Sequence, residues 1–171
     1  GTGTMTLSGV NTYSGTTTVS AGTLNLSGGA AILDTGTVTL ANTAGVILSL
    51  ASNEAIGTLT GGGGTGGNIT LNGATLTVGD AANITYAGVI SGTGGLTKTG
   101  SGTMTLSSAH TYTGATTINA GTLTLGAADR LSNSTAVTVA AGATFNLGGF
   151  SETIASIVSD GTVTLGSGNT V

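Results

Sequence analysis

Hydrophobic and polar residues alternate in short stretches along the whole chain. Threonine alternates with Met5 and Leu7 near the start, and Thr23–Leu26 and Val137–Val139 follow the same rule. A period of two places alternate side chains on opposite faces of a β-strand, here one apolar face and one that carries hydroxyls. Threonine is β-branched and favours strands, so the polar face is compatible with this assignment. The pattern predicts many strands of roughly three to five residues and no amphipathic helix of useful length.

The predicted strands recur roughly every ten residues and are separated by Gly, Asn, Ser and Asp, which favour tight turns. Proline is absent, as expected where nearly every backbone N–H belongs to a sheet. Only three Tyr and two Phe occur, too few for an ordinary β-sandwich core. A narrow tube filled by stacked Val, Ile, Leu and Ala needs no large rings. We therefore expect an all-β fold, a parallel β-helix (solenoid) of about seven coils at roughly 20 to 25 residues per coil, in preference to a sandwich or propeller.

A long internal repeat underlies the short one. Residues 3–26 and 102–125 are identical at 16 of 24 positions, at an offset of 99. Further along, residues 53–59 correspond to residues 151–157 at an offset of 98. We expect one continuous domain, residues 1–171, made of two related units, 1–99 and 100–171, of which the second is incomplete.

The charge of the chain is low and acidic. Charged residues make up 5%, the net charge is −4, and Lys98 and Arg130 are the two basic residues. No basic patch is available for nucleic acid or for an anionic membrane surface. The absence of cysteine excludes Cys-ligated metal and cysteine nucleophiles. No apolar run reaches the length of a membrane-spanning helix, and residues 1–20 do not have the features of a signal peptide, so we expect a piece cut from a longer precursor.

Residues 86–123 read YAGVISGTGGLTKTGSGTMTLSSAHTYTGATTINAGTL. This segment resembles the autotransporter-associated β-strand repeat, the passenger-associated repeat of type V secreted proteins. His110 departs from the pattern, which has asparagine there, as Asn11 does in the first copy. The resemblance implies a right-handed β-helix in the surface-exposed, extracellular passenger of an outer-membrane autotransporter. Many such passengers are adhesins or stalks, and the repeat is thought to assist passenger folding and export. The family's signal and membrane β-barrel are not found, so this piece is not expected to secrete itself.

Candidate catalytic residues are few. The acidic residues lie 8 to 49 residues apart, which does not predict a catalytic carboxylate pair; they are Asp34, Glu54, Asp80, Asp129, Glu152 and Asp160. Glu54 and Glu152 occupy equivalent repeat positions, which favours a structural role in a turn. His110 is the one histidine. It is interpreted as a turn residue, since one histidine makes neither a catalytic triad nor a metal site unaided.

The remaining motifs are also interpreted structurally. Gly61–Gly67 contains G-x-G-x-x-G without the helix of a nucleotide site, which indicates a flexible loop. The calcium-binding nonapeptide is absent because Gly66 stands where aspartate is needed. Lys98 is interpreted as a capped turn or a solvated charge, and Tyr13 and Tyr112 as turn anchors rather than sugar platforms. We therefore predict no catalytic, cofactor-binding or metal-ligating residue, no enzyme activity and no cofactor.

Three functions are compared. The favoured one is a non-enzymatic structural or adhesive passenger segment at the cell surface, with glycans or proteins of host or neighbouring cells as partners. The alternative is a fibre subunit that stacks end to end, because no capping element is predicted before Thr4 or after Thr164.

The least favoured function is that of an ice-binding β-helix with ranked Thr-x-Thr pairs. The pairs considered are separated by 33, 38, 28 and 19 residues, so their columns are not expected to line up; they are Thr4/Thr6, Thr37/Thr39, Thr75/Thr77, Thr103/Thr105 and Thr122/Thr124.

Overall fold

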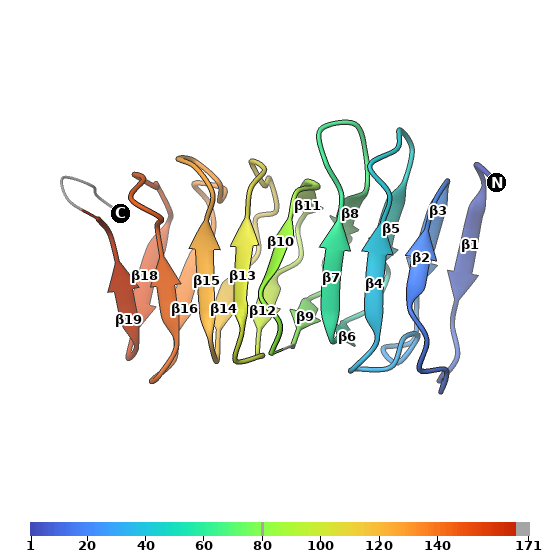
Figure 1. The fold of residues 1–171 in the computed structure, drawn as a ribbon, viewed down its shortest axis with the longest axis horizontal. Coiled ribbons are helices and arrows are strands. Elements are labelled where there is room, and N and C mark those ends of the chain that lie inside the picture. Colours follow the sequence, from blue (N-terminus) through green and yellow to red (C-terminus); the bar gives the residue numbers. More distant parts are fainter. Residues whose placement is uncertain (80, 167–171) are drawn as a thin grey trace.

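The computed structural model describes residues 1–79 and 81–166. These residues form an elongated stack of short strands, with the N-terminus at one end (Figure 1). The described part of the chain contains no helix, and so nothing helical in it could span a membrane. The strands are β1 (Thr4–Leu7), β2 (Thr17–Val19), β3 (Thr23–Leu26), β4 (Thr37–Leu40), β5 (Ile47–Leu50), β6 (Glu54–Ile56), β7 (Thr58–Gly61), β8 (Asn68–Leu71), β9 (Leu76–Val78), β10 (Ile84–Tyr86), β11 (Ile90–Gly92), β12 (Leu96–Lys98), β13 (Thr103–Leu106), β14 (Thr116–Ile118), β15 (Thr122–Leu125), β16 (Ala136–Val139), β17 (Thr144–Asn146), β18 (Ser156–Ser159) and β19 (Thr162–Thr164).

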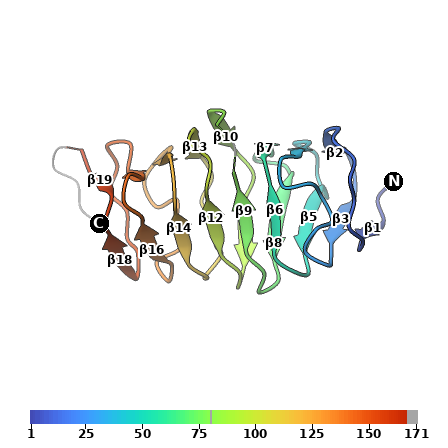
Figure 2. The ribbon, with the colours of Figure 1, turned by 90° about the horizontal axis from the view of Figure 1, so that it is seen from below.

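The strands form three parallel sheets. Sheet A has the order β1-β3-β5-β8-β11, sheet B the order β19-β17-β15-β13-β10-β7-β4-β2, and sheet C the order β18-β16-β14-β12-β9-β6. From β7 to β12 the chain visits sheets B, A and C in turn, so one coil gives one strand to each sheet. Sheet B lies in front in Figure 1, and sheet C is brought forward in Figure 2. The expected parallel β-helix is confirmed.

The coil number differs slightly from the expected one. Sheet B contains eight strands, one from each coil, so the described chain makes about eight coils rather than about seven. Strand partners are as few as 18 residues apart, as between Thr144 and Thr162. Coils are therefore shorter on average than the sequence pattern indicated.

Inward-pointing aliphatic side chains form the core. In sheet A the register places Leu26 next to Leu50 and Leu50 next to Leu71, and all three are fully buried. Neighbouring parallel strands lie about 4.8 Å apart, so these side chains stack in contact along the axis. Burying each one contributes about 1.5–3 kcal/mol relative to exposure. The stack supplies the stability that a cysteine-free chain of short strands requires.

The two related units are rotated relative to each other around the axis. Met5 lies on β1 in sheet A, whereas its equivalent, Met104, lies on β13 in sheet B. Local pairing is nevertheless the same, because Thr4 is paired with Thr23 and Thr103 is paired with Thr122. Counting sheet positions from β1 to β13, the repeat advances by about four and two-thirds coils. Equivalent residues therefore face different sides of the rod.

Candidate functional site

Glu54 and Glu152 are buried and bind backbone N–H groups of the preceding coil. The two carboxylate oxygens of Glu54 accept hydrogen bonds from Ala31 N and Ile32 N, at 3.2 and 2.6 Å. Those of Glu152 accept from Arg130 N and Leu131 N, both at 2.8 Å. Repeat-equivalent acids thus make equivalent contacts, as expected for a structural role. Burial raises the pKa of Glu152, although both backbone hydrogen bonds oppose this shift.

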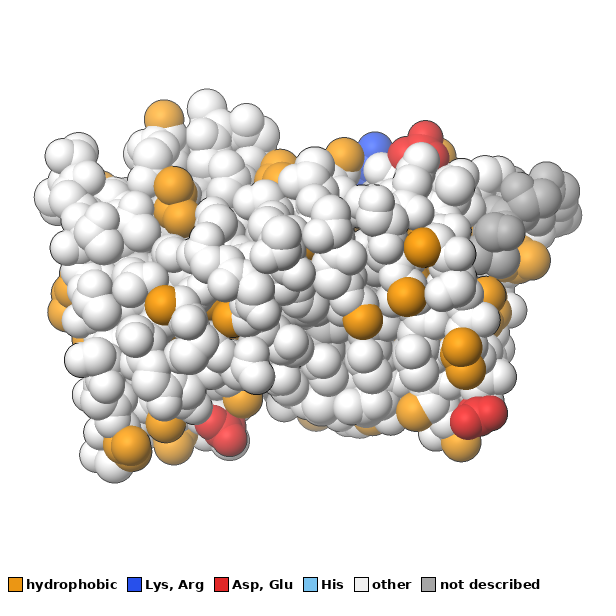
Figure 3. Space-filling view, turned by 180° about the vertical axis from the view of Figure 1, so that it is seen from behind, with side chains coloured by type: hydrophobic (Ala, Val, Ile, Leu, Met, Phe, Trp, Pro, Cys, Tyr) orange, Lys and Arg blue, Asp and Glu red, His pale blue; other side chains and the backbone are white. Residues whose placement is uncertain are grey.

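The other acids do not gather into a site. Asp34, Asp129 and Asp160 are exposed, and Asp80 lies outside the described residues. Over residues 1–79 and 81–166, no three His, Cys, Asp or Glu side chains are close enough together to hold a metal ion. On the side of the rod opposite sheet B, charged side chains are isolated from one another (Figure 3).

His110 is buried between two tyrosines. Its ring lies 6.5 Å from that of Tyr86 and 6.3 Å from that of Tyr112, between ring centres. His110 Nδ1 accepts a hydrogen bond from Ile90 N at 3.0 Å, while the buried Nε2 has no hydrogen-bond partner. Burial, and secondarily the charge of Arg130, lowers the pKa of His110 to about 4. The ring is neutral near pH 7 and is enclosed, which does not suit a general base that meets substrate.

Tyr13 and Tyr112 make the same contact in the two units. The Tyr13 hydroxyl is hydrogen bonded to Thr17 Oγ1 at 2.7 Å, and the Tyr112 hydroxyl to Thr116 Oγ1 at 2.5 Å. Each bond spans four residues and closes the irregular segment between two strands. The predicted anchoring of a turn fits this geometry, and Tyr112 is too buried to stack on a sugar.

Lys98 is buried rather than solvated. Its side chain is 4% exposed, and Nζ donates hydrogen bonds to the carbonyl oxygens of Gly100 and Ala120, at 2.5 and 3.2 Å. Of the two interpretations from the sequence, the capped turn fits and the solvated charge does not. Burial lowers the pKa of this ammonium group.

The glycine-rich segment Gly61–Gly67 forms the loop between β7 and β8 that projects from the rod (Figure 1). The side chain of Asn42, one coil earlier, holds it in place. Asn42 Oδ1 accepts hydrogen bonds from Thr65 N at 3.0 Å, Thr65 Oγ1 at 2.8 Å and Gly66 N at 3.2 Å. The loop is thus anchored to its neighbour, which the glycine content did not indicate.

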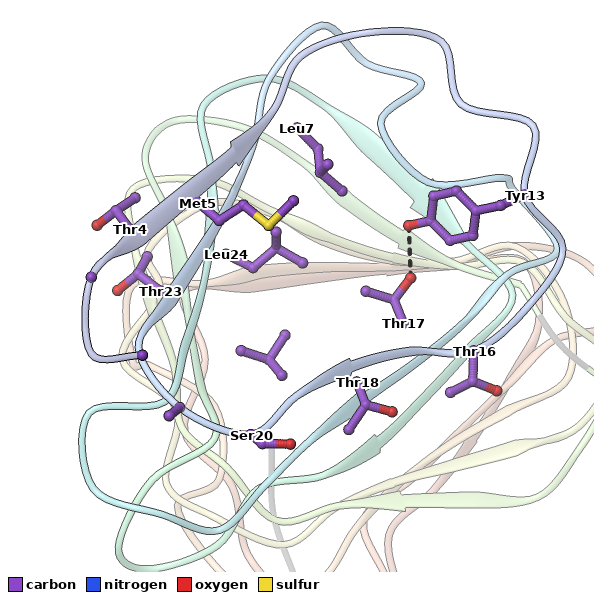
Figure 4. A pocket seen from close by; sticks show the side chains of 14 residues that line it. Thr4, Met5, Leu7, Tyr13, Thr16, Thr17, Thr18, Ser20, Thr23 and Leu24 are labelled. Carbon is purple, nitrogen blue, oxygen red and sulfur yellow. Dashed lines mark hydrogen bonds between the residues drawn. The ribbon is translucent and has the colours of Figure 1, made fainter.

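A cavity of about 570 Å³ opens at the end of the rod that carries β1. Met5, Leu7, Tyr13 and Leu24 point into it (Figure 4). Met5 is 63% exposed, whereas its repeat equivalent Met104 is 1% exposed beneath the coil that contains β10. The cavity is therefore the uncovered top of the core column and contains no group suited to chemistry.

The outward side of sheet B carries two parallel rows of hydroxyl side chains. Strand register aligns one row as Thr18, Thr39, Thr60, Thr85, Thr105, Thr124, Asn146 and Thr164. The second row, two residues earlier on each strand, is Thr16, Thr37, Thr58, Asn83, Thr103, Thr122, Thr144 and Thr162. We call these sixteen residues the threonine face. None of them is buried, and none is charged.

The expectation that the Thr-x-Thr columns do not line up is wrong for sheet B. The unequal spacing along the sequence has two causes. Some of the pairs considered lie on other sheets, as Thr4/Thr6 does on sheet A and Thr75/Thr77 does at sheet C. In addition, coil lengths differ, since Gly61 pairs with Tyr86 at 25 residues while Thr103 pairs with Thr122 at 19. Loops absorb these differences, and the strands stay aligned.

Comparison with known proteins agrees with the resemblance in the sequence. Residues 1–26 and 96–125 match the sequence profile of the passenger-associated-transport-repeat family. The chain carries two passenger-associated transport repeats. The adhesin BmaC autotransporter of Brucella suis biovar 1 (strain 1330) is 38% identical over 180 residues. That alignment covers all of this chain and 5% of the adhesin. No solved structure was found to match the chain.

The passenger-associated transport repeat can be placed on the fold. Its second match, residues 96–125, runs from β12 to β15 and includes Lys98, His110 and Tyr112. It therefore covers somewhat more than one coil, and its polar side chains bind the coils before and after it. The chemistry of the repeat is that of cohesion between coils.

Proposed function

We propose that the chain is a non-enzymatic segment of a surface-exposed autotransporter passenger and serves as a stiff β-helical stalk. One observation carries this proposal: the ladder of sheet B runs through eight strands without interruption above a continuous aliphatic core. A parallel ladder resists bending because each coil is hydrogen bonded to the next along its length. The adhesin relative supports placement at the cell surface.

Reach is the property that tests the stalk. Eight further coils lengthen a rod by about 38 Å at the spacing of parallel strands. Inserting residues 1–166 into the β-helix of a displayed passenger should move a tip label outward by that length, measured by electron microscopy. As a matched control, an insert with Leu50→Asp and Leu71→Asp breaks the core and should not extend the rod. An unchanged tip position with the intact insert contradicts the stalk.

The same architecture supports a role in passenger folding and export. Each finished coil presents open strand edges that template the next, so folding can proceed coil by coil as the chain emerges. Surface display of a passenger that carries Leu71→Asp should fall, while Thr65→Ala in the projecting loop should leave display unchanged. Equal display of both variants contradicts this role.

Absence of catalysis is also part of the proposal. It is supported by the scattered acids and the buried His110. Incubation with a panel of glycans should give no turnover, while pull-down against cell-surface glycans and proteins tests adhesive partners. Cleavage that survives purification and is lost in Glu152→Gln would contradict a purely structural chain.

End-to-end association is a second candidate function, favoured by the apolar surface at the end that carries β1. Val10 is 81% exposed and Met5 63%, beside the free edges of β1 and β2. Stacked copies would place β19 of one chain against β2 of the next, since both belong to sheet B. Long uniform filaments in electron micrographs, shortened by Met5→Asp, would support it. Monodisperse particles at high concentration would contradict it.

A further inference from the structure

We propose that the threonine face binds the ordered water of an ice surface. This inference does not depend on the stalk proposal, because it concerns one outward side of the rod whatever the rod supports. It rests on the alignment of eight ranks of paired side chains in sheet B.

The first argument is the regularity of the face. Strands in a parallel sheet are about 4.8 Å apart, and residues i and i+2 are about 6.6 Å apart along a strand. The two rows therefore form a flat rectangular net of hydroxyl and methyl groups. Ice likewise presents oxygen atoms in a flat periodic net, with a repeat close to the strand spacing in one direction. A periodic surface matches a crystal and not a single small molecule.

The second argument is chemical. Each threonine offers one hydroxyl, which both donates and accepts, and one methyl group. The β-branched side chain is stiff at χ1, so binding costs little rotamer entropy. Thr39 Oγ1 and Thr60 Oγ1 are hydrogen bonded at 3.0 Å between ranks, which shows that neighbouring hydroxyls share a direction. The face thus holds its hydroxyls in place before any ligand arrives.

The other two sheets provide internal contrast. On the outward side of sheet A, Ile47 and Asn68 interrupt the row that begins with Thr4. On sheet C, a row containing Thr77, Thr97 and Thr117 begins at Ala55 and reaches the exposed Val158. Only sheet B combines two complete rows among the described residues.

A protein partner fits the threonine face less well. Protein interfaces draw most of their affinity from buried Trp, Tyr and Arg anchors. The sixteen residues contain none of these, only fourteen Thr and two Asn. A flat face without protrusions or charge suits a lattice that is itself flat and uncharged.

Ice-affinity partitioning tests the proposal on the full 171-residue chain. An ice crystal is grown slowly in the protein solution, and the ratio of protein in ice to protein in liquid is measured. Wild type should be enriched in the ice. Thr105→Tyr, in the middle of the threonine face, should lower the ratio about tenfold, corresponding to a loss of about 1.4 kcal/mol. Thr97→Tyr, the same change on sheet C, is the matched control and should leave the ratio unchanged. Circular-dichroism melts establish that both variants are folded.

The opposite results are equally definite. Exclusion of the folded wild type from ice overturns the proposal, and so does an equal effect of the two variants. A chain that is excluded from ice but retained by crystalline chitin or cellulose, with retention lost in Thr105→Tyr, assigns the face to a polysaccharide and overturns ice binding. A dimer in sedimentation that Thr105→Tyr dissociates, with no ice enrichment, assigns it to a second copy of the chain.

Discussion

The carboxylate of Glu152 and the backbone N–H of Leu131 belong to neighbouring coils and are hydrogen bonded at 2.8 Å. Glu54 and Ile32 have the same relationship at 2.6 Å in the other unit. In both places the acid replaces a missing strand partner, since the irregular segments near Ile32 and Leu131 form no ladder with the following coil. A buried charge is therefore retained for the sake of two backbone donors.

Removing this acceptor should be costly. Glu152→Ala leaves the N–H groups of Arg130 and Leu131 buried without a partner, and we expect a loss of about 3 kcal/mol in the free energy of unfolding. Glu152→Gln keeps one carbonyl oxygen and should lose less. Urea denaturation of both variants measures this. Equal stability of the alanine variant and wild type would contradict the assigned role.

His110 should make the fold sensitive to acid. Its pKa is about 4 in the folded chain and 6.5 in the unfolded one, so the unfolded state takes up a proton first as the pH falls. Stability from this group is complete above pH 6.5 and is lost progressively between pH 6.5 and 4, by about 3 kcal/mol in all. In His110→Asn, which copies Asn11, this part of the pH dependence should vanish. Thermal melts of the two proteins from pH 7 to 4 should therefore converge, and parallel curves would refute the assignment.

The two tyrosine anchors should differ in their contribution to stability. Tyr112 is fully buried and Tyr13 is 40% exposed, although both bond a threonine four residues on. Tyr112→Phe leaves the buried Thr116 hydroxyl without its partner and should cost about 1 kcal/mol. Tyr13→Phe should cost less, because water can replace the lost bond. Chemical denaturation of the pair provides the comparison, and an equal loss would argue against burial as the cause.

Close coil stacking should make some glycines irreplaceable. A Cβ at Gly94 would overlap the backbone carbonyl oxygen of Ala74 in the previous coil, whereas a Cβ at Gly64 meets nothing within 4 Å. Gly94→Ala should destabilise the fold by about 1–3 kcal/mol through overpacking. Gly64→Ala, in the projecting loop, should be neutral or slightly stabilising. Melting temperatures of the two variants test this contrast.

Much of the fold could be predicted from local pattern. Alternation as in Met5 and Leu7 identifies strands, and the shortage of aromatic residues indicates a narrow core. Register between coils could not be predicted in the same way, because it depends on how many residues each loop absorbs. Thr60 and Thr85 are neighbours across a 25-residue coil that contains the whole Gly61–Gly67 loop. A search for constant spacing along the chain therefore missed the threonine face.

The polar contacts were partly accessible to sequence reasoning. The equivalence of Glu54 and Glu152 correctly indicated a shared structural part. The burial of Lys98 was not visible, because its partners, Gly100 O and Ala120 O, are backbone atoms that leave no mark in the sequence. Likewise, no sequence signal pairs Asn42 with the loop around Thr65.

The rotation between the two units has a consequence for long arrays. A repeat that advances by about four and two-thirds coils turns each successive copy by one side of the three-sided rod. Corresponding loops in consecutive copies would then wind around the shaft like the steps of a spiral staircase. Every third copy, after about fourteen coils, would again point in the same compass direction. A long shaft of this kind would meet its surroundings alike from every approach, without any change in the local sequence of the copies.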